Sequence, residues 1–299
     1  MNVIKSLKDV PQEEFLLSGH AACAGCGSTL ALRLTLKAFG KNTIVTIPAS
    51  CMSVVQGVFP LSAIKVPVLN IALPATGAVI SGIESVLRFR KEKRKIIVLG
   101  FGGDGATADI GLQTLSGAFE RGHDIVYVCH DNEAYMNTGI QRSSATPYGA
   151  WTTTTPIGKY SAGKSHFKKD MPAIFVAHRV PYVATASVAY PLDLIQKLKR
   201  AGSIKGPAYV HIHCPCPPGW RFPSNKTIQL ARLAVETGMW ILYEIENGDP
   251  STLRITVRPP KRKPVKEYLK LQGRFQHLRR EEIERIQKLV NEDYKRLGL

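Results

Sequence analysis

Short apolar runs alternate with amphipathic segments along most of the chain. The apolar runs, which predict strands, cover 43–47, 66–71, a central run starting at Lys95, 125–130, 183–188, 208–213, 240–245 and 254–257. The segments with helical spacing cover 28–39, 74–90, 110–121, 171–178, 191–200, 227–238 and 281–296. This alternation predicts an α/β fold in which a mostly parallel sheet is flanked by helices.

The central stretch reads as strand, Gly-rich turn, helix, strand and polar loop. Its turn contains Gly102, Gly103 and Gly105, whose bare backbone lets a phosphate approach closely. Asp104 and Asn132 follow the two strands and supply oxygen atoms of the kind that Mg²⁺ binds together with phosphate and water. If the strands are parallel neighbours, both residues lie at the carboxyl edge of the sheet. The alternative is an ordinary turn between strand and helix.

This arrangement resembles the Gly-Asp-Gly…Asn motif of thiamine-diphosphate enzymes. Gly-Asp-Gly alone is weakly specific, because glycine and aspartate gather in many turns. The preceding strand, and an asparagine at the end of the next strand, make the pattern more specific.

The chain has six cysteines, and five of them adjoin the ends of predicted elements: Cys23, Cys26, Cys51, Cys214 and Cys216. Zinc and a [4Fe-4S] cluster both accept four thiolates. Structural zinc usually takes two close pairs from one small module, whereas these cysteines span most of the chain. The spacing therefore favours a cluster held by Cys23, Cys26, Cys51 and either Cys214 or Cys216. Cys129 lies inside an apolar run and is predicted to be a core residue.

Composition narrows the class of protein. The 299 residues allow one large domain or two small ones. No apolar run reaches the 18 or so residues of a membrane helix, and residues 1–18 suggest a short arm without the apolar core of a signal peptide. We therefore expect a cytoplasmic protein that does not enter a membrane.

The net charge is +17, and residues 254–299 hold fourteen Lys and Arg against six Asp and Glu. The charge is compatible with nucleic-acid binding, with docking of an acidic protein or with a solvated surface. No nucleic-acid-binding module is recognisable in the sequence, so we expect no nucleic-acid partner.

Taken together, the motifs resemble those of the β subunits of pyruvate:ferredoxin oxidoreductases, within the 2-oxoacid:ferredoxin oxidoreductase family. The similarity covers roughly residues 15 to 250. The matching motifs are Gly19-His20-x-x-Cys23-x-x-Cys26-Gly27, Cys51, Gly103-Asp104-Gly105-x-x-x-Asp109-Ile110-Gly111, Asp131-Asn132-Glu133-x-Tyr135-x-Asn137-Thr138-Gly139-x-Gln141, Ser144-x-Thr146-Pro147 and Cys216-Pro-x-Gly219-Trp220.

The resemblance implies a thiamine-diphosphate-binding fold with Mg²⁺ and one [4Fe-4S] cluster. It implies that the cluster ligands are Cys23, Cys26, Cys51 and Cys216, where Cys216 is preferred to Cys214 because it directly precedes Pro-x-Gly-Trp. It implies that Mg²⁺ is bound by Asp104, Asn132 and the carbonyl of Ala134, and that the catalytic residue facing thiazolium and substrate is Asn137. The glycines expected to bring backbone to the cofactor are Gly25, Gly27, Gly103 and Gly105.

The implied function is oxidative decarboxylation of pyruvate to acetyl-CoA, with electrons passing through the cluster to ferredoxin. The alternatives are the same reaction on 2-oxoisovalerate, 2-oxoglutarate or oxalate and, more remotely, a zinc-stabilised basic binding module. The chain lacks a domain that would hold the aminopyrimidine ring and supply an activating Glu. We therefore expect it to act only with partner subunits, including a pyrimidine-domain subunit and a ferredoxin-like cluster subunit.

The expected domain organisation has two parts. Residues 1–255 form the cofactor-binding domain, and residues 256–299 form a basic helical extension that docks another subunit.

Overall fold

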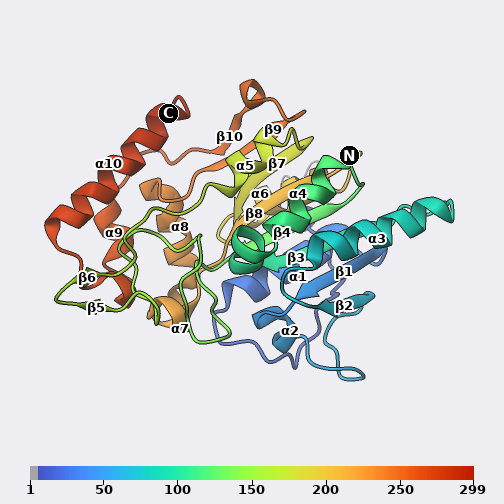
Figure 1. The fold of residues 1–299 in the computed structure, drawn as a ribbon, viewed down its shortest axis with the longest axis horizontal. Coiled ribbons are helices and arrows are strands. Elements are labelled where there is room, and N and C mark those ends of the chain that lie inside the picture. The colour runs from blue at the N-terminus through green and yellow to red at the C-terminus, as the bar shows by residue number, and fades with distance from the viewer. Residues whose placement is uncertain (1–5) are drawn as a thin grey trace.

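The computed structural model describes residues 6–299 and contains an eight-stranded sheet in the order β10-β9-β7-β8-β4-β3-β1-β2 (Figure 1). The strands are β1 (Thr43–Pro48), β2 (Val68–Ile71), β3 (Ile97–Gly103), β4 (Val126–Asp131), β7 (Tyr182–Ser187), β8 (Ala208–His213), β9 (Leu242–Glu246) and β10 (Arg254–Val257). The pairs from β2 to β7 are all parallel, and β9 and β10 extend the sheet antiparallel to their neighbours. The predicted fold class is confirmed.

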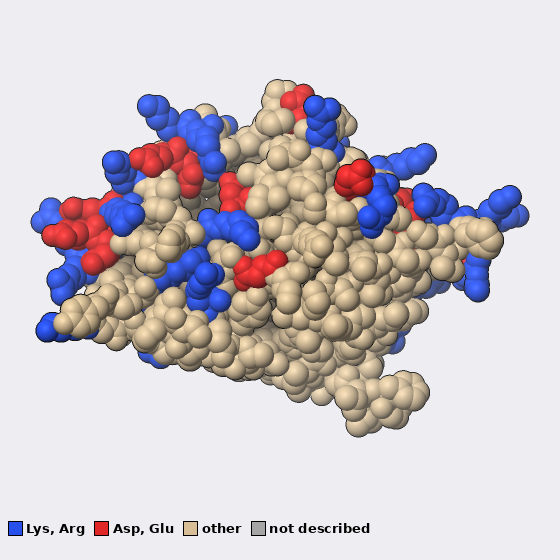
Figure 2. Space-filling view, viewed as in Figure 1, with Lys and Arg blue, Asp and Glu red and all other residues tan. Residues whose placement is uncertain are grey.

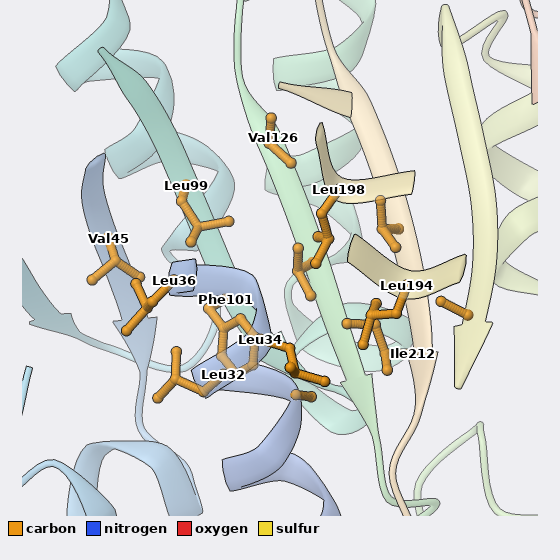
Figure 3. Close-up of a cluster of buried hydrophobic side chains, with 14 of the residues drawn as sticks. Leu32, Leu34, Leu36, Val45, Leu99, Phe101, Val126, Leu194, Leu198 and Ile212 are labelled. Atoms are coloured by element: carbon orange, nitrogen blue, oxygen red, sulfur yellow. The ribbon is translucent and has the colours of Figure 1, made fainter. Parts of the chain in front are cut away.

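Helices cover both faces of the sheet. One face packs against α1 (Gly27–Phe39) and α6 (Pro191–Ala201), which lie side by side and point Leu32, Leu36, Leu194 and Leu198 at the strands (Figure 3). The other face is covered by α3 (Thr76–Phe89), α4 (Leu112–Glu120) and α5 (Met171–Ala177). None of the helices within residues 6–299 is both long and apolar enough to cross a membrane.

Every residue of β4 is buried, which explains why its first four residues, Val126 to Cys129, are apolar without alternation. Val126 and Val128 point to the face covered by α1 and α6, whereas Tyr127 and Cys129 point to the opposite face. Cys129 is thus a core residue, as its position in the sequence predicts.

The helix expected over 110–121 begins differently from the prediction. A π-helical turn, Ala106–Ile110, comes first, and α4 starts only at Leu112. The two meet at Gly111, where an added Cβ would lie 2.0 Å from the carbonyl oxygen of Ala106. The wide turn directly follows Asp104, and such turns are frequent at functional sites.

The long polar segment after β4 is a folded loop with one small hairpin, β5 (Ile157–Gly158) and β6 (Ser161–Ala162). The amide of Lys164 donates to the carbonyl of Ala150, and this hydrogen bond holds the later part of the loop against its earlier part. The predicted arm at 1–18 falls partly outside the described residues. From Ser6 it includes a 3₁₀ turn, Leu7–Asp9, and a β-bridge from Leu16 to Ile64.

The basic tail packs onto the body of the protein. Helices α9 (Val265–Leu269) and α10 (Arg280–Arg296) share an apolar cluster with α8 (Thr227–Thr237) and β9. Part of the tail surface is therefore used within the chain, and the docking of another subunit on the remainder stays a prediction.

Candidate active site at the carboxyl ends of the parallel strands

The two halves of the central motif lie side by side. β3 and β4 are parallel neighbours with Gly103 opposite His130, so the residues that follow them meet at one edge of the sheet. A cavity of about 190 Å³ opens there, and its lining includes Gly103, Asp104, Gly105, Asn132, Ala134 and Asn137. The structure therefore brings together most of the predicted cofactor-binding residues.

Three polar groups converge in this cavity. One end of the Asn132 amide lies 2.9 Å from the carbonyl oxygen of Ala134 and 3.0 Å from Oδ1 of Asp104. When the amide nitrogen occupies that end, it donates to both oxygens. When the oxygen occupies it, this oxygen lies 2.9 Å from the Ala134 oxygen and 3.0 Å from Asp104 Oδ1. Adjacent corners of an octahedron are about 3.0 Å apart for Mg–O bonds of about 2.1 Å, so both distances match that spacing. The predicted magnesium ligands thus have a geometry that suits the ion.

Asp104 is almost fully buried, with 1% of its surface exposed. Ser143 donates from Oγ to Oδ2 of Asp104 at 2.5 Å. Burial, followed by the negative charge of Asp131, raises the pKa of the Asp104 carboxyl well above its ordinary value. A bound cation reverses this effect by favouring the ionised carboxylate, so the chemistry of the site fits a metal ion.

His130 lines the same cavity and was not predicted as a site residue. Its Nδ1 lies 3.2 Å from Ser28 Oγ, its ring stacks on Phe101 and its buried Nε2 has no hydrogen-bond partner. Burial lowers the pKa of His130 to about 4, so the imidazole is neutral near pH 7. An unpartnered buried nitrogen beside Gly103 fits a polar ligand group such as a diphosphate oxygen.

The predicted glycines separate into two pairs. Gly103 and Gly105 line the cavity, whereas Gly25 and Gly27 do not. A Cβ at Gly25 would lie 2.3 Å from the carbonyl oxygen of Ser224, and one at Gly27 would lie 2.8 Å from that of Pro215. These two glycines therefore let the N-terminal loop pack closely on the chain that follows β8, and their contact with a cofactor stays a prediction.

Four thiols gather beside the cavity. Cys23 and Cys26 lie on the loop before α1, Cys51 begins α2 (Cys51–Val55) and Cys216 precedes the short helix α7 (Pro217–Trp220). Burial, and then the neighbouring Cys26 and Cys23, raise the pKa of Cys51 to about 11. Burial raises the pKa of Cys216 to about 12, with further contributions from the same three thiols. Cys23 and Cys26 therefore lie near enough to affect both Cys51 and Cys216, which brings the four cysteines into one region of the structure.

Cys214 has a different environment from Cys216. It is fully buried in the core under α1, and its thiol donates to the carbonyl oxygen of Ile212 at 3.3 Å. Cys216 is partly exposed and accepts a hydrogen bond from the amide of Gly219. This difference in accessibility favours Cys216 as the ligand of a bound group.

Within residues 6–299, no three His, Cys, Asp or Glu side chains are close enough together to bind a single metal ion. A zinc ion brings its thiolates to about 4 Å from one another, because each Zn–S bond measures about 2.3 Å. In a [4Fe-4S] cluster each thiolate binds a separate iron, so the ligands stand further apart.

The loop after α2 carries exposed apolar side chains beside the cavity. The exposed fractions are 75% for Val58, 93% for Phe59 and 80% for Leu61. Figure 2 shows this loop as a protruding knob at the lower right, on an edge almost free of charge, whereas Lys and Arg gather over α10 and the end of α3. We call residues 57–62 the apolar knob.

Several side chains that hold the carboxylates around the cavity were also not predicted from the sequence. Ser143, Lys168 and Arg274 contact the site carboxylates, although they lie in a loop and in the tail. Only Ser143 carried a signal, because it adjoins the Ser144-x-Thr146-Pro147 motif. The other two are ordinary cations in basic segments, and no sequence pattern distinguishes them.

Known proteins match the chain across its length. Residues 69–212 match the family of thiamine pyrophosphate enzyme C-terminal TPP binding domains. Pyruvate synthase subunit PorB of Methanothermobacter marburgensis is 55% identical over 282 residues, which cover 94% of this chain and 96% of that protein. Ketoisovalerate oxidoreductase subunit VorB of Pyrococcus furiosus is 53% identical over 300 residues, which cover 98% and 96%.

Among solved structures, a 2-oxoglutarate:ferredoxin oxidoreductase from Magnetococcus marinus has a similar fold. The TM-score is 0.59 at 19% identity, and the match covers 86% of this chain and 88% of that one. At this identity the likeness concerns the fold.

Proposed function

Because the chain belongs to the β subunits of the 2-oxoacid:ferredoxin oxidoreductases, we propose that it contributes half of an active site for oxidative decarboxylation of pyruvate to acetyl-CoA. In this proposal the chain binds the diphosphate of thiamine diphosphate through Mg²⁺. Cys23, Cys26, Cys51 and Cys216 would hold a [4Fe-4S] cluster, which would supply one-electron transfer towards ferredoxin. Coenzyme A would be the acceptor of the acyl group.

The observation that carries the proposal is the convergence of two ligand sets at one sheet edge. Asn132 lies within 3.0 Å of both Asp104 Oδ1 and the Ala134 carbonyl oxygen. Cys51 lines the same cavity, and Cys23, Cys26 and Cys216 are near enough to interact with it electrostatically. A metal–diphosphate site and a thiolate-bound cluster would therefore be neighbours, which suits short-range electron transfer.

Each group of the chain has a defined task. The three oxygens bind Mg²⁺, Gly103 and Gly105 admit the diphosphate, and Nε2 of His130 donates to one of its oxygens. When bound, thiamine diphosphate supplies the carbon nucleophile and the electron sink that decarboxylation of a 2-oxoacid requires. Asn137 is exposed at the mouth of the cavity and would orient the substrate there.

The thiols need deprotonation before they bind iron. Burial holds the pKa values of Cys51 and Cys216 above the ordinary value, so both are neutral thiols at pH 7 in the chain alone. Cluster binding would release their protons, as metal binding to cysteine generally does. Backbone N–H groups at Gly219 and Cys51 already point at these two sulfurs and would stabilise the ligated state.

A partner subunit is needed to close the cavity. Its volume of about 190 Å³ lies below the roughly 300 Å³ or more that a small-molecule site usually offers. The apolar knob follows α2, whose first residue, Cys51, lines the cavity. We expect the partner that holds the aminopyrimidine ring to pack against Val58, Phe59 and Leu61. A Phe59→Ser variant that copurified with its partners and retained full turnover would refute this placement.

The substrate is tested on the purified complex. Viologen reduction is measured across pyruvate, 2-oxoisovalerate, 2-oxoglutarate and oxalate, with and without coenzyme A. We expect the highest kcat/KM for pyruvate in the presence of coenzyme A. A preference for 2-oxoisovalerate would make this branched 2-oxoacid, rather than pyruvate, the substrate. The 53% identity with VorB supports this alternative almost as strongly as the PorB match supports pyruvate.

Metal analysis of the same preparation tests the cluster. Iron with acid-labile sulfide supports it, and stoichiometric zinc without iron would support the binding-module alternative. The isolated chain, supplied with thiamine diphosphate and Mg²⁺, should not turn over any 2-oxoacid.

The basic tail is a candidate for steering an acidic ferredoxin. Two of its cations already have partners within the chain: Arg262 donates to Asn291 at 2.6 Å and Lys263 pairs with Glu236 at 2.8 Å. Lys266 is exposed, so charge reversal there is the cleanest test. An unchanged salt dependence of ferredoxin reduction would exclude this role.

A further inference from the structure

The loop that presents Asn132 and Ala134 has an unusual backbone. Glu133, between them, adopts a φ of 66°, a left-handed conformation that residues with a side chain rarely adopt. Such conformations persist only where surrounding contacts enforce them. The orientation of both neighbouring groups depends on this one residue.

Contacts from outside the loop hold its backbone. The carbonyl of Glu133 accepts from Thr146 Oγ1 at 2.6 Å, and the carbonyl of Asn132 accepts from Trp220 Nε1 at 2.7 Å. The amide of Glu133 donates to Asp131 Oδ1 at 2.9 Å. With these groups engaged, the amide side chain of Asn132 lies 3.0 Å from Asp104 Oδ1 and 2.9 Å from the carbonyl oxygen of Ala134.

The side chain of Glu133 is buried, with 5% of the residue exposed, and two cations bind it. Arg274 donates to Oε2 at 2.5 Å, and Lys168 donates to Oε1 at 3.2 Å. Each carboxylate oxygen thus has a cationic partner, and the side chain is anchored from two different segments.

Arg274 reaches this loop from the tail, 141 residues away in sequence. It is 2% exposed, and Gln272 accepts a hydrogen bond from its Nε at 2.9 Å. Its guanidinium also lies over the ring of Trp220, 3.8 Å from the centroid. One side chain thus contacts Glu133 directly and stacks on the Trp220 ring that donates to Asn132.

We propose that Arg274 is a positioning residue of the metal site: it holds Glu133 and Trp220, and thereby fixes Asn132 and the Ala134 carbonyl in the orientation that binds Mg²⁺. The proposal rests on the magnesium role given above to Asp104, Asn132 and Ala134. It also assigns the basic tail a role within the subunit, because Arg274 belongs to the tail.

The test uses the intact complex and the variants Arg274→Met and Arg274→Lys. Mg²⁺ affinity is titrated at saturating thiamine diphosphate by tryptophan fluorescence, and kcat is measured against Mg²⁺ concentration. We expect Mg²⁺ binding to weaken by about tenfold or more in both variants, since a lysine cannot bind Glu133 and Gln272 through two nitrogens while stacking on Trp220. Excess Mg²⁺ should restore most of kcat, because Arg274 touches no reacting atom.

The matched control is Arg262→Met, on the same tail. Arg262 also lies over an aromatic ring, that of Tyr294 at 4.6 Å, and donates a hydrogen bond to Asn291, yet it does not line the cavity. Its loss should change Mg²⁺ affinity less than twofold. In a double-mutant cycle, Glu133→Gln combined with Arg274→Met should cost little more than either change alone.

The outcomes distinguish the positioning role of Arg274 from the existence of the metal site. Unchanged Mg²⁺ affinity in Arg274→Lys, together with lost binding in Asp104→Asn, would overturn the positioning role and leave the metal site intact. Unchanged binding in Asp104→Asn would overturn the metal site and the positioning role together. If Arg274→Met fails to assemble, Arg274→Lys, which keeps the charge, decides the question.

Discussion

The two ligand sets at the sheet edge are built in different ways. The oxygens of the metal site are buried and braced by side chains from distant segments, as Ser143 on Asp104 and Thr146 on the Glu133 carbonyl illustrate. The thiols lie on loops, and Cys23 is exposed at the rim of a groove of about 750 Å³. Neither Cys26 nor Cys216 caps its helix with a side-chain hydrogen bond.

The comparison suggests that the metal site is preorganised by the protein, whereas the thiol site depends on its ligand for order. A braced site loses affinity when a remote brace is removed. A site assembled from loops loses stability when its ligand is removed, because ligand binding contributes to folding there. Each prediction below changes one set and observes the other.

The largest effect is expected from Asp104→Asn. The substitution removes the only anionic ligand of the proposed magnesium site, so Mg²⁺-dependent turnover should fall on the order of a hundredfold or more. Iron and sulfide content should stay at the wild-type level. Loss of iron in this variant would show that the two sites are not independent.

The next largest contrast is between Cys216→Ser and Cys214→Ser. Serine at 216 should lose the cluster, its visible absorption and viologen reduction. Serine at 214 should keep iron content, since the Cys214 thiol is committed to the Ile212 carbonyl in the core. Iron content is measured anaerobically in both variants, and the opposite pattern would transfer the ligand role to Cys214.

A smaller effect is expected from His130→Phe. The phenyl ring can keep the stacking on Phe101 but has no nitrogen to donate to a diphosphate oxygen. A hydrogen bond to a charged group contributes about 1.5–3 kcal/mol, so thiamine diphosphate should bind about tenfold more weakly. Affinity for thiamine diphosphate is measured by fluorescence titration at saturating Mg²⁺. Unaltered binding would show that Nε2 of His130 does not bind the diphosphate.

The smallest effect concerns pH and His213, which lies at the end of β8 among Trp220, Trp240 and Tyr268. Burial lowers its pKa to about 4. Between the ordinary pKa of about 6.5 and pH 4, the unfolded chain binds a proton that the folded chain does not, so stability decreases as the pH falls. The full difference is worth roughly 3 kcal/mol.

A His213→Phe variant should therefore show a smaller decrease in Tm between pH 7 and pH 4.5 than the wild type. Calorimetry of the complex at both pH values measures it. An equal decrease in both proteins would mean that His213 is not the titrating group.

Most of the fold could be predicted from local sequence, because buried parallel strands are continuously apolar and each ends in turn-forming residues. The ends of β8 and β10 agree with their predicted ranges, 208–213 and 254–257. The start of α4 could not be predicted, because the π-helical turn depends on contacts that the spacing of apolar residues does not encode.

The sequence by itself identified the candidate metal and cofactor ligands, since Asp104, Asn132 and the cysteines are marked by residue type and by their place at element ends. The tertiary structure alone decided how these groups are held. Arg274 and Lys168 look like surface cations in the sequence. The burial of Arg274 against Glu133 and the pairing of Lys168 with Asp131 result from long-range packing of the tail and of the loop after β4. Such packing leaves no local pattern, because a charge is buried only where the fold supplies its partner.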